Sequence, residues 1–144
     1  MGKYDRLKRI ILFIHQLPQI LLSRLIVSNN DVMIHKVDGV RIYHTTRMEG
    51  ISLGDTIFIS GDVYEGTWLV KHEFGHVIQS RILGWLYLPL IFVPSLLWYQ
   101  LMNFIERVFC LNDEESAEMY YQFYTEYTAN RLVSDLRKKN IKKV

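Results

Sequence analysis

The stretch Lys71-His72-Glu73-Phe74-Gly75-His76 decides how the rest of the sequence is interpreted. It has the pattern H-E-x-x-H, and residues i and i+4 lie on the same face of a helix. His72 and His76 can therefore bring two imidazole nitrogens to one point, as a tetrahedral zinc site requires. Glu73 follows the first histidine and lies within reach of a water on such a metal, which is the general-base position of a metal-assisted hydrolase.

The residues on either side predict the helix that carries this pattern. Thr67 is a suitable N-cap and Gly84 a suitable stop, so we expect a helix from Trp68 to Leu83. Gly75 has no side chain, so another backbone can approach the helix there, and the preceding strand is the candidate. The side opposite the histidines would pack on the core through four apolar residues: Val70, Phe74, Val77 and Ile78.

The region before this helix predicts strands. Asp38-Gly39 stands between the apolar runs Val32–Val37 and Val40–Thr45, which is a hairpin signal. The stretch Ile51–Ser60 alternates and contains a Gly-Asp turn, so we expect a strand from Thr56 to Ser60. Residues 61–66 are expected to form a loop.

A zinc site with two histidines needs a third protein ligand and an open position for water. Asn112 or Asp113 can cap a final helix, which we expect from Glu114 to about Lys138. We choose Glu126 as the third ligand, because a second helix folded against the first would bring it to the histidines. Asn130, one turn further on, can hydrogen-bond a ligand and fix its orientation. Three other acids on this helix are alternatives to Glu126: Glu114, Glu115 and Glu118.

Two apolar segments accompany the metal-binding pattern. Residues 4–27 have a basic start, a polar stripe of His15, Gln19 and Ser23, and a kink expected at Pro18. Residues 82–105 carry no charge, and their prolines and aromatic residues indicate a bent or re-entrant hairpin at a membrane interface. Packing against the protein's own core is the alternative for both. In a membrane, basic residues near both ends would place the termini in the cytoplasm: Lys3, Arg6, Lys8, Arg9, Arg137, Lys138, Lys139, Lys142 and Lys143.

Composition narrows the class of protein. The chain has 144 residues, 49% of them hydrophobic and 22% charged, which is enough for one folded domain with a core. The net charge of +2 gives no reason to expect nucleic acid as a partner. The single cysteine, Cys110, cannot form an internal disulfide, which suits a reducing compartment. We interpret His15, His35 and His44 as structural residues rather than ligands.

Together these elements predict an α+β chain. We expect an apolar N-terminal helix within residues 1–30 and a metal-binding domain over residues 31–144, with residues 82–105 as an apolar insertion. The domain would contain a small antiparallel sheet, the H-E-x-x-H helix and a C-terminal helix.

Three stretches, Ile51–Ser60, Leu69–Gln79 and Thr125–Asn130, resemble the small bacterial zincin-like metallopeptidases of gluzincin type, with a leucine-glycine strand, H-E-x-x-H-x-x-Q and a later E-x-x-A-N. The resemblance covers about residues 50–133. It implies a minimal zincin-like fold with a glutamate as third ligand, the position of Glu126. That branch places an acidic residue four positions after this ligand, whereas this chain has Asn130.

The expected function is therefore peptide-bond hydrolysis, with Zn²⁺ held by the three ligands and Glu73 as general base. The strand Thr56–Ser60 would pair with an extended peptide or protein substrate, and one phenol of Tyr120, Tyr124 or Tyr127 would assist the oxyanion. We expect a cytoplasmic protein, or one at the cytoplasmic membrane through residues 4–27 and 82–105. The alternative is a non-catalytic, membrane-associated metal-binding or interaction protein. The oligomeric state is left open.

Overall fold

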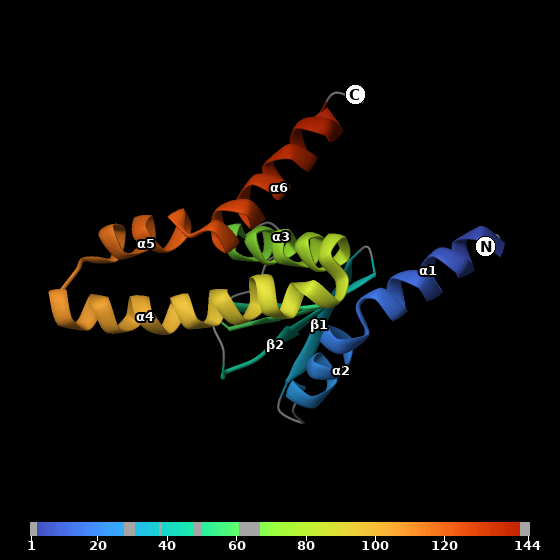
Figure 1. Ribbon diagram of the computed structural model, residues 1–144, viewed down its shortest axis with the longest axis horizontal. Helices are drawn as coiled ribbons and strands as arrows, with labels where there is room; N and C mark the ends of the chain where they lie inside the picture. Colours follow the sequence, from blue (N-terminus) through green and yellow to red (C-terminus); the bar gives the residue numbers. More distant parts are fainter. Residues whose placement is uncertain (1–2, 28–30, 38, 48–49, 61–66, 142–144) are drawn as a thin grey trace.

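The fold consists of six α-helices and a small four-stranded sheet in the computed structural model, which describes residues 3–27, 31–37, 39–47, 50–60 and 67–141 (Figure 1). The predicted α+β class is confirmed. The strands are β1 (Val32–Val37), β2 (Val40–His44), β3 (Gly50–Leu53) and β4 (Thr56–Ile59). The helices are α1 (Lys3–His15), α2 (Leu17–Ile26), α3 (Trp68–Leu83), α4 (Val93–Phe109), α5 (Asp113–Gln122) and α6 (Tyr124–Ile141), with a 3₁₀ turn, η1 (Gly84–Leu86), and a π turn, η2 (Leu88–Phe92), between α3 and α4.

The sheet is mixed, and the expected antiparallel sheet is therefore corrected. Its strand order is β1-β2-β4-β3, with β2 and β4 parallel and the two outer pairs antiparallel. After β2 the chain forms the edge strand β3, turns at Gly54, whose φ is 61°, and returns as β4 between β2 and β3. The alternating pattern predicted the strands and the Gly-Asp turn, but alternation does not specify which strand pairs with which. Asp38 and the expected loop 61–66 lie outside the described residues.

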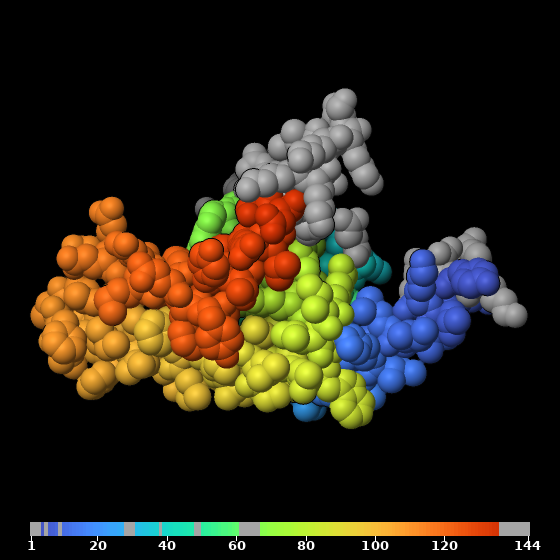
Figure 2. Space-filling view, turned by 45° about the horizontal axis from the view of Figure 1, so that its top comes forward, coloured from blue at the N-terminus to red at the C-terminus, as the bar shows by residue number. Residues whose placement is uncertain are grey.

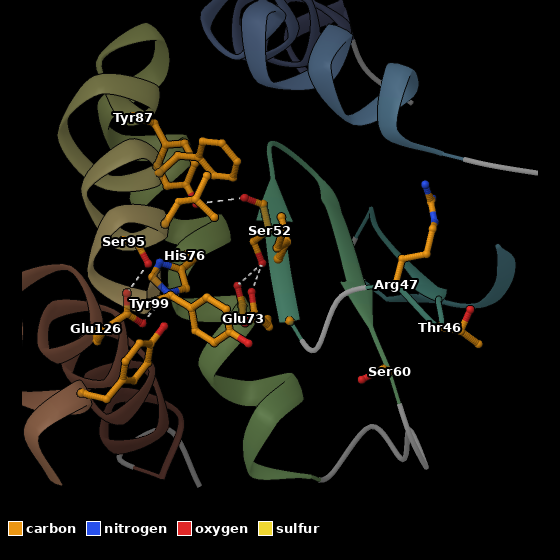
Figure 3. Close-up of a pocket in the computed structure, with 15 residues that line it drawn as sticks. Thr46, Arg47, Ser52, Ser60, Glu73, His76, Tyr87, Ser95, Tyr99 and Glu126 are labelled. Atoms are coloured by element: carbon orange, nitrogen blue, oxygen red, sulfur yellow. Dashed lines mark hydrogen bonds and ion pairs between the residues drawn. The ribbon is translucent and has the colours of Figure 1, made fainter. Parts of the chain in front are cut away.

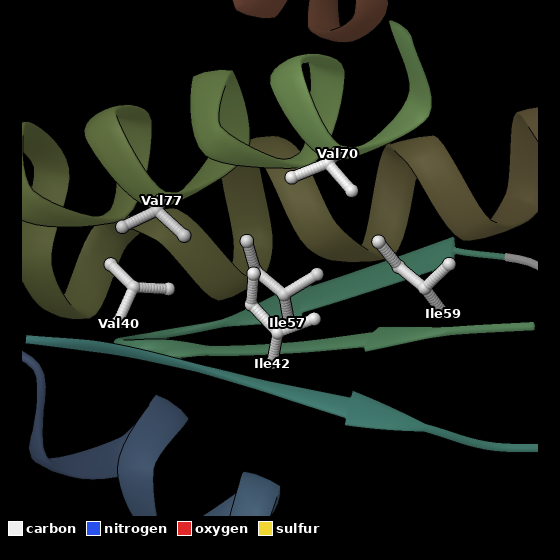
Figure 4. Packing of buried hydrophobic residues seen from close by; sticks show 6 residues of the cluster. All are labelled: Val40, Ile42, Ile57, Ile59, Val70 and Val77. Atoms are coloured by element: carbon white, nitrogen blue, oxygen red, sulfur yellow. The ribbon is translucent and has the colours of Figure 1, made fainter. Parts of the chain in front are cut away.

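Helix α3 covers one face of the sheet and has the bounds that its caps predict. The hydroxyl of Thr67 accepts a hydrogen bond from the Val70 amide, and Gly84 ends the helix with a φ of 54°. Val70 and Val77 point into the sheet, where they pack against four strand residues (Figure 4): Val40, Ile42, Ile57 and Ile59. These contacts fix the rotation of α3 about its axis and turn its two histidines away from the sheet.

The close approach at Gly75 is confirmed, but its partner is α6 and not a strand. A Cβ placed on Gly75 would lie 2.3 Å from the carbonyl oxygen of Ala129. The side of α3 that faces the sheet is filled by the valines, so the side with no Cβ is left for a second helix. Crossing at a glycine brings the two backbones close enough for side chains on α3 and α6 to meet.

The expected single C-terminal helix is wrong, because it breaks into α5 and α6 at Phe123. Asn112 caps α5 through a capping box with Glu115, and the ψ of Phe123 is 140°. The Phe123 ring stacks on Trp98 of α4 at a centroid distance of 4.7 Å, and the Trp98 indole donates to the Tyr120 carbonyl. In a continuous helix that carbonyl would accept from the amide of Tyr124. A tertiary contact with α4 therefore takes the place of that hydrogen bond, and the Tyr120 carbonyl also accepts from the Phe123 amide at 3.3 Å.

The N-terminal segment also divides, with a bend of 72° between α1 and α2. The break falls at Gln16 and not at Pro18, since proline is tolerated in the first turn of α2, where no backbone donor is needed. Gln16 donates to the Ser80 hydroxyl at 2.8 Å and Gln19 donates to the Gly84 carbonyl. The polar stripe of α2 thus packs on the protein interior, which was one of the two interpretations of this segment.

The expected hairpin in residues 82–105 is also wrong. After the short turn at Gly84–Leu86, the chain forms one helix from Leu88 to Phe109 that runs alongside α5 (Figure 1). Pro89 and Pro94 lie in the first turns of η2 and α4, where they do not interrupt the course of the helix. Within the described residues this is the one helix that is long and apolar enough to cross a membrane by itself.

Candidate metal centre

Two imidazole nitrogens and one carboxylate oxygen meet between α3 and α6. The Oε2 atom of Glu126 lies 3.0 Å from Nε2 of His72 and 3.2 Å from Nε2 of His76, and the two Nε2 atoms are 3.2 Å apart. All three side chains are buried. Among the described residues, this is the one group of His, Cys, Asp and Glu side chains arranged to hold a metal ion.

The hydrogen bond made by Nδ1 of each imidazole ring determines whether Nε2 carries a proton or a lone pair. Nδ1 of His76 lies 2.7 Å from Oε1 of Gln79, whose amide nitrogen donates to the Thr125 carbonyl and the Thr128 hydroxyl. Those two donations fix the Gln79 oxygen toward the ring, so Nδ1 of His76 carries the proton. Nδ1 of His72 faces Oδ1 of Asn130 at 2.8 Å in the same way. In its neutral form each ring therefore directs an Nε2 lone pair at the same point.

This geometry matches the open face of a tetrahedral metal site. Ligands at about 2.0–2.1 Å from zinc are separated from one another by about 3.3 Å in a tetrahedron. The three observed separations of 3.0–3.2 Å are close to that value. Three acceptor lone pairs at such distances repel one another unless a positive charge lies between them, which is either a proton or a metal ion.

Helix α6 positions Glu126, and its neighbours hold the carboxylate in one orientation. Oε1 accepts hydrogen bonds from the Ser95 hydroxyl of α4 and from the Thr125 hydroxyl at 2.9 Å. Oε2 is thereby left to face the two histidines. The contacts of Gly75 with Ala129 and of Gln79 with α6 set the distance between the helices. Three helices thus contribute to the placement of one ligand atom.

The charges of the site favour an ionised carboxylate beside a positive partner. Burial by itself would raise the pKa of Glu126, but hydrogen bonds from His72 and His76 and the charge of His76 hold it well below its ordinary value. Burial would likewise lower the pKa of His76, but its hydrogen bond to Glu126 and the charges of Glu73 and Glu126 raise it. A metal ion bound here would take the place of the proton that these groups share.

Glu73 lies beside the metal-binding group and is held by β3. Its Oε2 atom accepts a hydrogen bond of 2.6 Å from the Ser52 hydroxyl, which also donates to the Glu73 carbonyl at 3.0 Å. A Cβ on Gly50 would lie 2.6 Å from Oε1 of Glu73, so the glycine leaves room for the carboxylate. Ser52 is in turn fixed through its own carbonyl, which accepts from the Tyr87 hydroxyl at 2.9 Å. The carboxylate predicted as a general base therefore has a defined position.

Two adjoining cavities, of about 580 and 300 Å³, open on either side of Glu73. Gly50, Glu73, Tyr99 and Tyr120 line both. Figure 3 shows His76, Glu126, Glu73 and Ser52 directed into the larger cavity from α3, α6 and β3. Apolar residues form much of its remaining wall: Ile51, Tyr87, Phe92 and Leu96. We call the two cavities together the cleft.

The structure separates the alternatives that the sequence left open. Glu114, Glu115 and Glu118 are exposed on α5, where Glu115 completes the helix cap and Glu118 accepts from Gln122, so none of them joins the histidines.

Of the three tyrosines proposed to assist the oxyanion, Tyr124 and Tyr127 are exposed. Tyr120 lines the cleft, and burial together with the charge of Glu126 raises the pKa of its phenol, which stays a neutral hydrogen-bond donor.

The strand assigned to the substrate needs correction. Strand β4, the predicted Thr56–Ser60, is paired with β2 on one side and β3 on the other, so it has no free edge. Strand β3 lies at the edge of the sheet, and Gly50, Ile51 and Ser52 line the cleft. The substrate-pairing strand is therefore β3 if the cleft binds an extended peptide.

Sequence reasoning missed Ser52 and Ser95, the two hydroxyls that hold the carboxylates of Glu73 and Glu126. Ser52 could have been found from its place in the alternation of β3, which turns it to the same face as its register partner Ile57 and so toward α3. Nothing in the sequence singles out Ser95, a serine in an apolar helix.

Comparison of the chain with family models, curated proteins and solved structures found no match, so the zincin-like resemblance stays a prediction.

Proposed function

We propose that this chain is a zinc-dependent peptidase, with His72, His76 and Glu126 as ligands and Glu73 as general base. One observation carries the proposal: three lone-pair donors from α3 and α6 lie 3.0–3.2 Å apart, beside a fixed carboxylate at the wall of a cleft. Two imidazoles and one carboxylate form a donor set that suits zinc. Asn130 and Gln79 would keep both rings in the metal-binding tautomer.

Each protein group then has a distinct task. A zinc ion in this site would polarise a water molecule and the carbonyl of the bond to be cleaved. Glu73 would accept the proton of the water and deliver it to the leaving nitrogen. Ser52 is a positioning residue, because its hydrogen bond keeps the Glu73 carboxylate in one orientation. Tyr120, a neutral phenol at the junction of the two cavities, is the candidate donor to the developing oxyanion.

The cleft supports an extended peptide as the substrate. Strand β3 is an edge strand, and the backbone of Gly50 and Ile51 at the cleft could pair with a peptide strand, whereas the Ser52 carbonyl is taken by Tyr87. The apolar wall of the larger cavity suits a bulky apolar side chain next to the cleaved bond. A peptide bound in this way would pass Glu73 and the two histidines.

The deciding experiment compares zinc content and hydrolysis in the Glu73→Gln variant. Glutamine preserves the shape of the side chain but cannot accept the proton. We expect about one zinc per chain in both proteins, and peptidase activity on a mixture of peptides that falls by about 10²–10⁴-fold in the variant, as for loss of a general base. Mass spectrometry of the products measures the cleavage.

Glu118→Gln on α5 is the matched control, because Glu118 is exposed and lines neither cavity of the cleft. It should retain both zinc and activity. A zinc-loaded protein with hydrolysis unaffected by Glu73→Gln would exclude the proposed mechanism. Bound zinc with no hydrolysis of any peptide by the unaltered chain would instead identify a structural metal site.

A further inference from the structure

A straight apolar stripe runs along the outer side of α4 and η2. Its members recur at intervals of 3, 4, 4, 3 and 4 residues, an average close to the helical repeat of about 3.6, so they lie along one face over about 27 Å. All of them are at least 46% exposed. The members of this α4 stripe are Leu90, Val93, Leu97, Leu101, Phe104 and Val108.

The stripe continues past the end of its helix toward α1. Trp85, which is exposed in the turn before η2, donates its indole hydrogen to the Ile14 carbonyl at 2.8 Å. Ile82, also exposed, places its carbonyl 3.4 Å from the His15 ring. Helix α1 adds exposed Leu7 and Ile11 beyond this junction. Figures 1 and 2 show α1 extending from the end of the molecule where α3 turns into α4.

Helix α2 buries Ile20 together with two amides on its inner side and leaves two leucines exposed on its outer side. Gln16 and Gln19 are buried against α3 and η1, whereas Leu21 and Leu25 are 51% and 83% exposed. Leu21 and Leu25 therefore add exposed apolar surface to that of the α4 stripe, with the exposed Arg24 between them.

The other side of α4 excludes a helix surrounded by lipid on all sides. Ser95, Tyr99 and Met102 face the cleft or the protein interior. Helix α5 runs alongside α4 and carries four exposed carboxylates (Figure 1): Asp113, Glu114, Glu115 and Glu118. A spanning α4 would draw these charges into hydrocarbon, which is strongly unfavourable. A helix that lies in the plane of the interface immerses its stripe alone.

Four exposed charged residues on the helices that carry this apolar surface are basic. Arg6 and Lys8 are exposed on α1, Arg24 is exposed on α2 and Arg107 is exposed in the last turn of α4. Anionic headgroups attract such residues when an amphipathic helix lies at a bilayer surface. A second copy of the chain would supply an apolar surface but no excess of negative charge, because the net charge of the chain is +2. Charge complementarity therefore favours a lipid surface as the partner.

We propose that the α4 stripe, Trp85 and the outer sides of α1 and α2 dock this protein on a bilayer that contains anionic phospholipids. Helices α1, α2 and α4 lie in the interface, and no segment needs to cross the bilayer. Leu96 and Tyr99 of α4 line the cleft on the side away from the stripe, so the cleft lies about one helix diameter, roughly 10–12 Å, from the lipid surface. If the proposed peptidase function holds, its substrate is a membrane-proximal segment of another protein.

Vesicle flotation tests the docking. The full chain is mixed with phosphatidylcholine vesicles with and without phosphatidylglycerol. We expect flotation with the anionic vesicles and a partition coefficient lower by roughly fivefold for each basic residue removed in Arg6→Gln and Lys8→Gln. Leu97→Glu and Phe104→Glu should each lower it by at least about tenfold. Met119→Glu, an exposed apolar residue of α5, is the matched control and should float as the unaltered chain does.

Quenching by lipids brominated in the acyl chains gives a second readout that does not depend on how stable the charged variants are. Trp85 should be quenched on vesicle binding. The quenching should disappear in Trp85→Phe, because the two remaining tryptophans face the protein: Trp68 stacks on His72, and Trp98 stacks on Phe123. Absence of flotation, or a concentration-dependent dimer that Leu97→Glu dissociates, would overturn the proposal. A chain that floats but binds no zinc would retain the docking and lose the peptidase.

Discussion

At the scale of single residues, the candidate site depends on two neutral amides, one of which stands where the zincin-like resemblance places an acid. Asn130 accepts from Nδ1 of His72 and Gln79 accepts from Nδ1 of His76. Both hold a ring in the tautomer that directs Nε2 at Glu126. Neither adds negative charge, so Glu126 is the one carboxylate in contact with both histidines. Orientation of the ligands, more than accumulated charge, supports metal binding here.

Substitution of Asn130 tests this role. Asn130→Ala removes the acceptor of His72, so we expect zinc affinity to fall by about 10–100-fold. Asn130→Asp keeps the acceptor and adds a charge, so it should bind zinc at least as tightly as the unaltered chain. Competition with a chromophoric chelator measures both affinities. Gln122→Ala, an exposed amide on α5, should leave the affinity unchanged, and an equally unchanged affinity in Asn130→Ala would show that Asn130 does not orient the ring.

At the scale of elements, the packing of α3 on α6 determines whether the ligands meet. The backbones touch at Gly75 and Ala129, and Gln79 donates across the contact to the Thr125 carbonyl and the Thr128 hydroxyl. The break at Phe123 begins α6 shortly before this contact and gives Glu126 its position in the first turn. The distance between the two helices is thus set by the glycine contact and by the hydrogen bonds of Gln79.

Gly75→Ala should separate the helices. The added Cβ would lie within 2.9 Å of the oxygen, carbon and Cα of Ala129, which are backbone atoms that cannot rotate away. We expect a loss of about 1–3 kcal/mol or more in the free energy of unfolding, together with weaker zinc binding, because Glu126 moves with α6. Denaturant unfolding measures the loss. Adding Ala129→Gly should not restore stability, and such a restoration would place the clash in the Ala129 side chain instead.

At the scale of the whole molecule, the three ligands join segments far apart in the chain. The two histidines lie in the middle of the sequence and Glu126 near its end, and α4 contributes Ser95 between them. The hydrophobic cluster around Val70 and Val77 holds α3 on the sheet but does not include α6. A bound metal would therefore link α6 to a part of the fold that is already formed by apolar packing.

Zinc should accordingly raise the melting temperature. At a free zinc concentration of about 100 times the dissociation constant, binding to the folded chain contributes about 2.7 kcal/mol. For a chain of 144 residues we expect an increase of roughly 5–10 °C, measured by differential scanning calorimetry with and without chelator. His72→Ala should show no increase. A shift that persists in that variant would mean that zinc binds elsewhere.

Much of the local structure around the site could be predicted. Thr67 and Gly84 set the bounds of α3, and the spacing of His72 and His76 places both rings on one side of it. These are properties of one helix, decided by capping and by its periodicity. The hairpin at Gly39 and the turn at Gly54 follow from residues that adopt positive φ. Glu126 was chosen because the site needed a third ligand, and the structure places it at the histidines.

The remaining features depend on contacts between distant segments. Insertion of β4 next to β2, the break at Phe123 against Trp98 and the meeting of Gly75 with Ala129 have no local signal in the sequence. The sequence by itself determined how His72, Glu73 and His76 lie relative to one another, because residues within about one helical turn have fixed relative positions. Only the tertiary structure decided that Glu126, Ser52 and Ser95 complete the site, because packing between helices and strands sets distances that periodicity cannot.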